Sequence, residues 1–355
     1  MSTSPKILVL GCGGIGGIVA AHLAAQGADV CAVSRNPDVA QAVGSRGFEL
    51  TGVGVEGALR VPGRVDTKIP PGRYDLIILA TQPPDLEAAA RQALPHLAPE
   101  GRLVTVSNGL PEERVAAVVG DPGRVIGAIV GWGATMTGPG VFERTSEGGF
   151  VLGRLDGGQD PALDVLAALL SRIGPVERSD NLRGARWSKL AINCAISSLG
   201  TLGGDRLGVL MRYRHVRRLA LEVMTEVVLI ARAEGVRLEK LAGTIDLDWL
   251  ALTEQERAQK GSLSLAAKHG VLLVVGLKYR RLRSSMLAAL ERGRPPAVDQ
   301  LNGEITTRAT RLGLPTPVNS AVVQRIHDLG AGRGAPAHHN LARLYQDTRG
   351  LVVRA

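Results

Sequence analysis

A glycine-rich turn near the N-terminus places the strongest constraint on how this chain can fold. The segment KILVLGCGGIGGIVAAHLAAQGADVCAVSRN (residues 6–36) contains an apolar run, the pattern G-x-G-x-x-G, a helix-like stretch that ends at Gly27, and a second apolar run. This order predicts a β-α-β unit. In such a unit Gly11 permits the tight turn, Gly13 lets the backbone approach a pyrophosphate, and Gly16 allows close helix–strand packing. The chain is therefore expected to begin with a dinucleotide-binding unit.

The same turn indicates where the dinucleotide would bind. The N-terminus of a helix attracts phosphate because its first N–H groups are unpaired and its dipole is positive there. The residues expected to contact the cofactor at this turn are Gly11, Gly13, Gly14, Ile15 and Gly16.

The residues after the second apolar run favour one cofactor. An acidic side chain at this position would bind the 2′-hydroxyl of NAD and repel a 2′-phosphate. The chain instead has Ser34 and Arg35. Because a hydroxyl and a guanidinium both bind phosphate oxygens, we expect NADP(H), with Ser34 and Arg35 as contacts. A solvated loop arginine is the alternative for Arg35.

The rest of the N-terminal half alternates between apolar runs and helix-like segments. The apolar runs are YDLIILAT (74–81), RLVTVSNGL (102–110), RVIGAIVGWGAT (124–135) and GGFVLGR (148–154). The alternation predicts an α/β domain over residues 1–178, with a Rossmann-type, doubly wound parallel sheet. Asn108 closes one strand on the side where ligands bind in such sheets, although Asn-Gly is also a common turn dipeptide.

From residue 179 onward the apolar spacing becomes helical. It is clearest over 185–203, 213–235 and 298–313, so a mainly α-helical domain is predicted over residues 179–355. Lys189 and Asn193 lie four residues apart on what should be the apolar stripe of the first of these helices. A lysine there either keeps its ammonium group in water or faces a substrate cleft.

Five motifs in the correct order resemble the ketopantoate reductase (2-dehydropantoate 2-reductase) family. They are GCGGIG at 11–16, SNG at 107–109, KLAINC at 189–194, SSML at 284–287 and VDQLNG at 298–303. The resemblance covers most of the chain except residues 205–280, whose role the sequence does not indicate.

The resemblance implies an NADPH-dependent reduction of a 2-oxo acid, ketopantoate to pantoate, with Lys189 as the general acid. It places Asn193 in substrate orientation and Asn108 near the nicotinamide and the substrate. Ser285 takes the position that binds the substrate carboxylate. Ser197 occupies the place of a further substrate-binding asparagine. The chemistry agrees, because hydride addition to a carbonyl leaves an alkoxide that needs a proton and a nearby positive charge.

Other positions depart from the family pattern and leave the substrate open. Ala297 stands where relatives carry a glutamate, Gln82 where many carry a lysine, and Ser197 where an asparagine is expected. One alternative is therefore the same fold and cofactor acting on a different ketone or an imine. Another, from a different class, is a non-catalytic NADP(H)-binding protein, which the retained Lys189 disfavours.

Composition excludes several other functions. The net charge of +9 is dispersed and only 3% of residues are aromatic, so we expect no nucleic-acid partner. The three cysteines show neither a disulfide framework nor zinc spacing, so we expect no metal and a reducing, cytoplasmic location. The apolar runs are too short to predict a membrane segment. The expected partner is a small anionic or carbonyl substrate, and a homodimer is left open.

Overall fold

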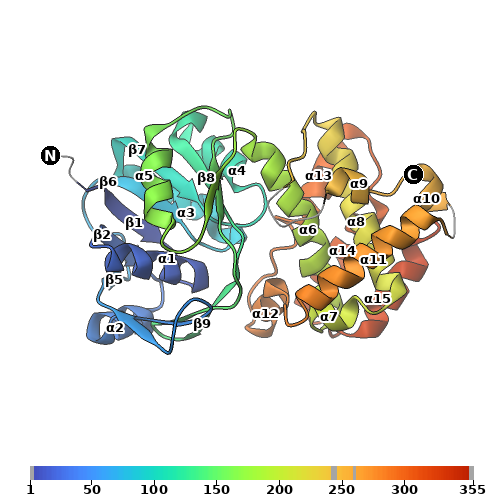
Figure 1. Ribbon diagram of the computed structural model, residues 1–355, viewed down its shortest axis with the longest axis horizontal. Coiled ribbons are helices and arrows are strands. Elements are labelled where there is room, and N and C mark those ends of the chain that lie inside the picture. Colours follow the sequence, from blue (N-terminus) through green and yellow to red (C-terminus); the bar gives the residue numbers. More distant parts are fainter. Residues whose placement is uncertain (1–3, 241–245, 259–260, 352–355) are drawn as a thin grey trace. The chain divides into compact units, whose positions relative to one another are not determined.

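The computed structural model describes residues 4–240, 246–258 and 261–351. The chain forms two compact units that divide after Leu182 (Figure 1). The sequence placed this division at 178/179, where the strand alternation ends. The structure places it at the start of a long helix instead.

The N-terminal unit is built on an eight-stranded sheet of order β12-β11-β8-β7-β6-β1-β2-β5. Its strands are β1 (Lys6–Leu10), β2 (Asp29–Val33), β5 (Val65–Asp66), β6 (Tyr74–Leu79), β7 (Leu97–Thr105), β8 (Val125–Val130), β11 (Phe150–Gly153) and β12 (Val176–Arg178). Every neighbouring pair is parallel except β11 and β8. The predicted Rossmann-type α/β fold is therefore confirmed.

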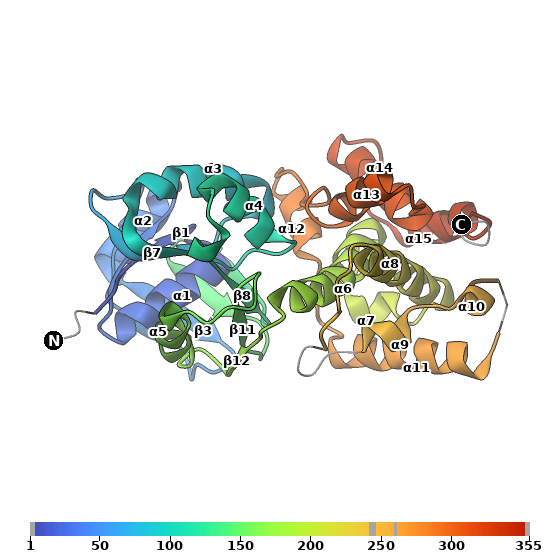
Figure 2. The same ribbon diagram turned by 90° about the horizontal axis from the view of Figure 1, so that it is seen from above.

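Helices cover both faces of this sheet, as its apolar strands require. They are α1 (Gly14–Ala25), α2 (Pro37–Arg46), α3 (Leu86–Ala93), α4 (Pro111–Val119) and α5 (Pro161–Leu170), with 3₁₀ turns η1 (Pro83–Asp85), η2 (Leu94–His96) and η3 (Pro122–Arg124). One core contains side chains of α1 and α5, and the other contains those of α3 and α4. Figure 2 shows these two pairs on opposite sides of the strands.

A second, four-stranded sheet of order β4-β3-β10-β9 was not predicted from the sequence. Its strands are β3 (Phe48–Gly52), β4 (Leu59–Val61), β9 (Ala134–Gly138) and β10 (Val141–Arg144). This sheet also explains the direction of β11. The chain passes from β8 to β11 through the β9–β10 hairpin and not through a crossover helix, so β11 returns antiparallel to β8.

The C-terminal unit is helical over the part of it that the structure describes. Its helices are α6 (Leu182–Gly203), α7 (Leu207–Leu210), α8 (Arg214–Ala233), α9 (Leu247–Leu250), α10 (Glu254–Ala258), α11 (Leu263–Lys278), α12 (Ser285–Glu291), α13 (Asn302–Leu312), α14 (Pro317–Gly330) and α15 (His338–Thr348). The largely buried α8 packs against α9, α11, α13, α14 and α15. Among the described residues, no helix combines the length and the apolar character that crossing a lipid bilayer needs.

The inner face of α11 carries two buried ionisable groups. Lys268 donates to Glu256 at 2.6 Å and to the carbonyl oxygen of Ala251 at 2.7 Å. The neighbouring His269 is only 8% exposed. Burial, together with the positive charge of Arg217, lowers its pKa to about 4.

This pKa predicts acid-dependent stability. Between pH 6.5 and about 4, the unfolded chain binds a proton at residue 269 that the folded chain does not bind. The free energy of unfolding should therefore decrease as pH falls through this range, by at most about 3 kcal/mol. Melting temperatures of the wild type and His269→Gln at pH 7 and pH 4.5 test this, since the wild type should lose more stability than the variant. The exposed His339→Gln serves as the control, and equal losses in all three proteins would contradict the prediction.

Candidate active site

The cofactor residues predicted in the N-terminal unit lie at one edge of the sheet. Gly11 follows β1, Ser34 follows β2, and Asn108 lies three residues after the end of β7. These strands and β6 are consecutive in the order β7-β6-β1-β2, and β6 is followed by Thr81. Because neighbouring strands here are parallel, their carboxyl ends form a single ligand-facing edge.

Gly11 and Gly16 are positions of the glycine turn that are sterically closed to larger residues. Gly11 has φ +106°, and a Cβ on it would lie 2.8 Å from the carbonyl of Ala80. A Cβ on Gly16 would lie 1.9 Å from the carbonyl oxygen of Gly11. Both positions therefore require glycine so that the turn can form and α1 can pack on β1.

Gly13 differs from these two glycines because it faces open space. It is exposed, and a Cβ on it would meet no atom within 4 Å. It is the N-cap of α1, and the first intrahelical bond runs from Gly17 N–H to its carbonyl oxygen at 2.8 Å. The N–H groups of Gly14, Ile15 and Gly16 precede that bond. The turn thus leaves room for a phosphate group and offers backbone N–H donors to bind it. Both features are suited to the pyrophosphate of a dinucleotide.

One residue at this edge was missed by the sequence interpretation. The hydroxyl of Thr81 is buried and has no hydrogen-bond partner among the described residues. The backbone N–H of Thr81 would lie 2.9 Å from a Cβ on Gly11, so the side chain begins beside the glycine turn. An unsatisfied buried hydroxyl at such a position is suited to hydrogen-bond a ligand.

Ser34 and Arg35 are in different environments. Ser34 is 8% exposed, and its Oγ accepts a hydrogen bond from Asn36 N–H at 3.2 Å. The Arg35 side chain is 86% exposed and pairs with Asp85 at 2.9 Å. An exposed ion pair of this kind contributes little to stability, so Arg35 can exchange its partner for a phosphate at small cost.

In the C-terminal unit, α6 carries the predicted catalytic residues on one stripe. Lys189, Ile192, Asn193, Ile196 and Ser197 are partly exposed, whereas the residues between them are buried. Their spacing of three and four places all five on one face. Lys189, Asn193 and Ser197 therefore line a partly exposed face of an otherwise buried helix.

Asn193 shows that this stripe has unused hydrogen-bonding capacity. Its side-chain Nδ2 is buried and has no acceptor within the described part of the chain. An amide donor without a partner normally costs free energy, so its presence is a mark of a ligand-binding position.

The opposite side of α6 is held by buried hydrogen bonds. Asn302 is fully buried and accepts from the hydroxyl of Ser198. It donates to the carbonyl oxygen of Cys194 at 3.2 Å and to Asn319 at 2.8 Å. Asn319 in turn donates to Glu226 on α8 at 2.7 Å. Asn302, which belongs to the VDQLNG motif, thus fixes the position of α6.

Glu226 completes this network at its far end. Its carboxyl group also accepts from the backbone N–H groups of Val318 and Asn319. Burial raises the pKa of Glu226 to about 7, although these donors oppose the rise. The network therefore joins α6, α13, α14 and α8.

The two serines of the SSML motif have separate roles in the structure. Ser284 is buried, caps α12 through Leu287 N–H, and donates to the carbonyl oxygen of Ser197 at 2.8 Å. Ser285 is exposed as the first residue of α12. Ser284 therefore places Ser285 next to the α6 stripe, a positioning role that the sequence did not indicate.

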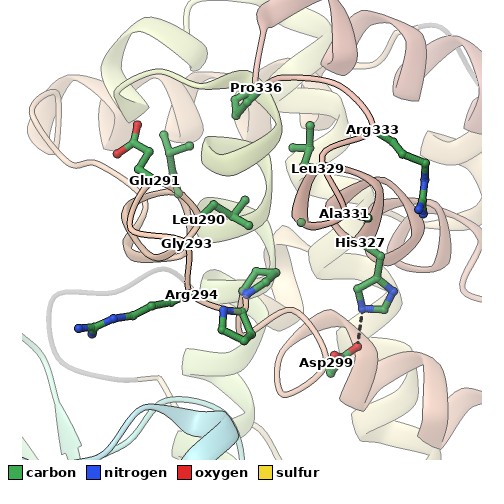
Figure 3. Close-up of a pocket in the computed structure, with 14 residues that line it drawn as sticks. Leu290, Glu291, Gly293, Arg294, Asp299, His327, Leu329, Ala331, Arg333 and Pro336 are labelled. Atoms are coloured by element: carbon green, nitrogen blue, oxygen red, sulfur yellow. Dashed lines mark hydrogen bonds and ion pairs between the residues drawn. The ribbon is translucent and has the colours of Figure 1, made fainter. Parts of the chain in front are cut away.

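A cavity of about 750 Å³ in the C-terminal unit lies apart from these residues (Figure 3). It is lined by Leu287, Leu290, Glu291, Gly293, Arg294, Pro295, Pro296, Asp299, His327, Leu329, Gly330, Ala331, Arg333 and Pro336. His327 and Asp299, both in its lining, pair with each other at 2.9 Å. Pro296 in its wall directly precedes Ala297, but Lys189, Asn193 and Ser285 do not line it.

Within the described ranges, no cluster of three His, Cys, Asp or Glu residues could hold a metal ion.

The fold and the site define the class of this protein as a two-unit oxidoreductase. Residues 7–157 match the family described as "Ketopantoate reductase PanE/ApbA", and residues 181–330 match "Ketopantoate reductase PanE/ApbA C terminal". The chain therefore belongs to the ketopantoate reductase family, which confirms the resemblance seen in the motifs.

Individual relatives agree with this assignment. The 2-dehydropantoate 2-reductase of Pyrococcus abyssi is 27% identical over 315 residues, which is 88% of this chain and 94% of the relative. A PanE/ApbA family ketopantoate reductase from Ralstonia eutropha JMP134 is 25% identical, with a TM-score of 0.76 over 92% of this chain and 99% of its own. D-mandelate dehydrogenase, solved with NADH and anilino(oxo)acetate, has the same fold with a TM-score of 0.76 and 19% identity, covering 92% and 99%.

Because Gly13 faces open space, a small side chain at this position should weaken cofactor binding without destabilising the fold. Gly13→Ala meets no atom of the protein, so its melting temperature should match the wild type. The added methyl group would occupy the path by which a pyrophosphate approaches, and the Kd for NADPH should rise about tenfold or more. Fluorescence titration with NADPH measures this change. Gly16→Ala is the contrasting variant and should destabilise the fold itself. Unchanged NADPH affinity in Gly13→Ala would contradict the assignment of this turn.

Proposed function

We propose that this protein is an NADP(H)-dependent reductase that converts ketopantoate, or a closely related 2-oxo acid, to the 2-hydroxy acid. The observation that carries the proposal is the α6 stripe, on which Lys189, Asn193 and Ser197 are partly exposed on an otherwise buried helix. Family membership supplies the reaction type, and the stripe supplies the groups that the reaction needs.

Individual side chains of this protein have distinct roles in the reaction. Bound NADPH would supply the hydride. Lys189 donates a proton to the substrate carbonyl oxygen and stabilises the negative charge that develops on it. Asn193 donates its unpartnered Nδ2 to the same substrate and orients it. The exposed hydroxyl of Ser285, at the start of α12, binds the substrate carboxylate. Asn108, at the carboxyl edge of the sheet in the N-terminal unit, contacts the nicotinamide of the bound cofactor.

The choice of NADP(H) over NAD(H) is supported by the end of β2. D-mandelate dehydrogenase has the same fold and was solved with NADH, so the fold alone does not select the cofactor. In this chain the position is occupied by Ser34, without the carboxylate that would repel a 2′-phosphate. Arg35 offers an exposed guanidinium next to it.

Lys189→Ala tests the mechanism. Loss of the general acid should lower kcat about a hundredfold or more, while the Kd for NADPH stays unchanged. Steady-state NADPH oxidation and fluorescence titration measure the two quantities. The exposed Lys68→Ala is the control and should retain full activity. Wild-type turnover in Lys189→Ala would exclude Lys189 as the proton donor.

A second candidate function follows from Ala297. Its methyl group cannot accept a hydrogen bond from a substrate hydroxyl, so the pocket is suited to a 2-oxo acid without that hydroxyl. In this case the enzyme keeps its cofactor and proton donor but acts on a different branched 2-oxo acid.

Ala297→Glu separates the two substrates. A carboxylate at this position should raise kcat/KM for ketopantoate about tenfold and leave 3,3-dimethyl-2-oxobutanoate, which lacks only the hydroxyl, unchanged or slower. NADPH oxidation is measured for both substrates with both proteins. Equal changes for the two substrates would show that residue 297 does not face the hydroxyl.

A further inference from the structure

Helix α11 exposes an uninterrupted apolar stripe, which we call the outer stripe. It consists of Leu263, Ala266, Ala267, Gly270, Leu273, Val274 and Leu277, all of them exposed. Leu263 is 93% exposed, Val274 63% and Leu277 57%. The buried residues Leu265, Lys268, His269, Leu272 and Gly276 form the opposite face, which packs on α7 and α8. Figure 2 shows α11 at an edge of the helical unit.

A surface helix normally places polar side chains on its outer face. On α11 every residue of the outer stripe is apolar, and the ionisable Lys268 and His269 lie on the buried face. The usual pattern is therefore reversed. A continuous apolar face of this length marks an interaction surface.

The order of side chains within the outer stripe indicates its partner. Counted from Gly270, leucines lie seven residues before and seven residues after, at 263 and 277. Small Ala266 and Ala267 lie on one side of Gly270, and the larger Leu273 and Val274 lie at matching distances on the other. A second α11 running antiparallel would place small residues against large ones on both halves. This is the self-complementarity that a two-fold interface requires.

We propose that two copies of this chain pair through α11, antiparallel, about a two-fold axis that passes near Gly270. A Cβ on Gly270 would meet no atom within 4 Å, so the helix surface is open at that position. Glycine and alanine at the centre let the two backbones approach closely, and the leucines at the ends cover the contact.

The charges beyond the two ends of α11 favour the same orientation. Exposed Asp246 and Glu254 lie on the segments before its N-terminus, and Lys268 ties the N-terminal half of α11 to that region through Ala251. Lys278 and Arg280 are exposed at its C-terminus. Antiparallel pairing brings the acidic end of each copy to the basic end of the other, whereas parallel pairing would bring like charges together.

Sedimentation velocity over a concentration series tests the dimer. The wild type should sediment at twice the chain mass of 37.2 kDa. Gly270→Glu buries an unpaired charge at the two-fold axis, and should raise the dimer dissociation constant about a hundredfold or more while the melting temperature of the monomer is kept. Gly44→Glu is the matched control, because Gly44 is also an exposed glycine inside a helix with open space at its Cβ. It should remain dimeric.

Crosslinking tests the position of the axis. Oxidised Gly270→Cys should form a covalent dimer, since the axis brings the two residues 270 together and the native Cys12, Cys31 and Cys194 are buried. Gly44→Cys should not crosslink. A monomeric wild type, a dimer that survives Gly270→Glu, or equal crosslinking of both cysteine variants would each overturn the proposal.

Discussion

The contact between Gly16 and the carbonyl oxygen of Gly11 is the constraint on which the N-terminal unit depends. A Cβ on Gly16 would stand 1.9 Å from that oxygen, so the first helix can lie against the first strand only because residue 16 has no side chain. This packing directs the start of α1 toward the carboxyl edge of the sheet. The other residues predicted to bind the cofactor follow neighbouring strands, and the parallel order brings them to the same edge.

In the helical unit, polar groups in the core hold the helices in position. Asn302, Asn319 and Glu226 are each at most 1% exposed and are satisfied by one another and by backbone groups. Hydrogen bonds have fixed geometry, so this network sets the position of α6 more narrowly than apolar contacts would. A single helix therefore has a rigidly held side and a side available to ligands, with Lys189 and Asn193 on the latter.

The features that local sequence could predict are those encoded over a few turns or one β-α-β unit. The glycine turn, the parallel sheet and the helical spacing around Lys189 are of this kind. The sheet of β3, β4, β9 and β10 was missed because it pairs Glu49 with Val141 across a long stretch of chain. Helices α7, α9 and α10 are too short to show a period. On α11 the outer stripe is as apolar as a buried face, which hides the usual alternation. The positioning roles of Ser284 and Asn302 arise from contacts between helices, and no spacing along the chain encodes them.

The buried position of Asn302 has a consequence for how chains of this type diverge. The hydrogen bonds of Asn302 stabilise the fold. A homologous protein that has lost its catalytic activity would therefore still need this asparagine in order to fold. Lys189 lies on the partly exposed face of α6, outside this buried network, so the network itself does not require a lysine there. Persistence of the VDQLNG stretch in a distant sequence therefore reports an intact scaffold and not a retained activity.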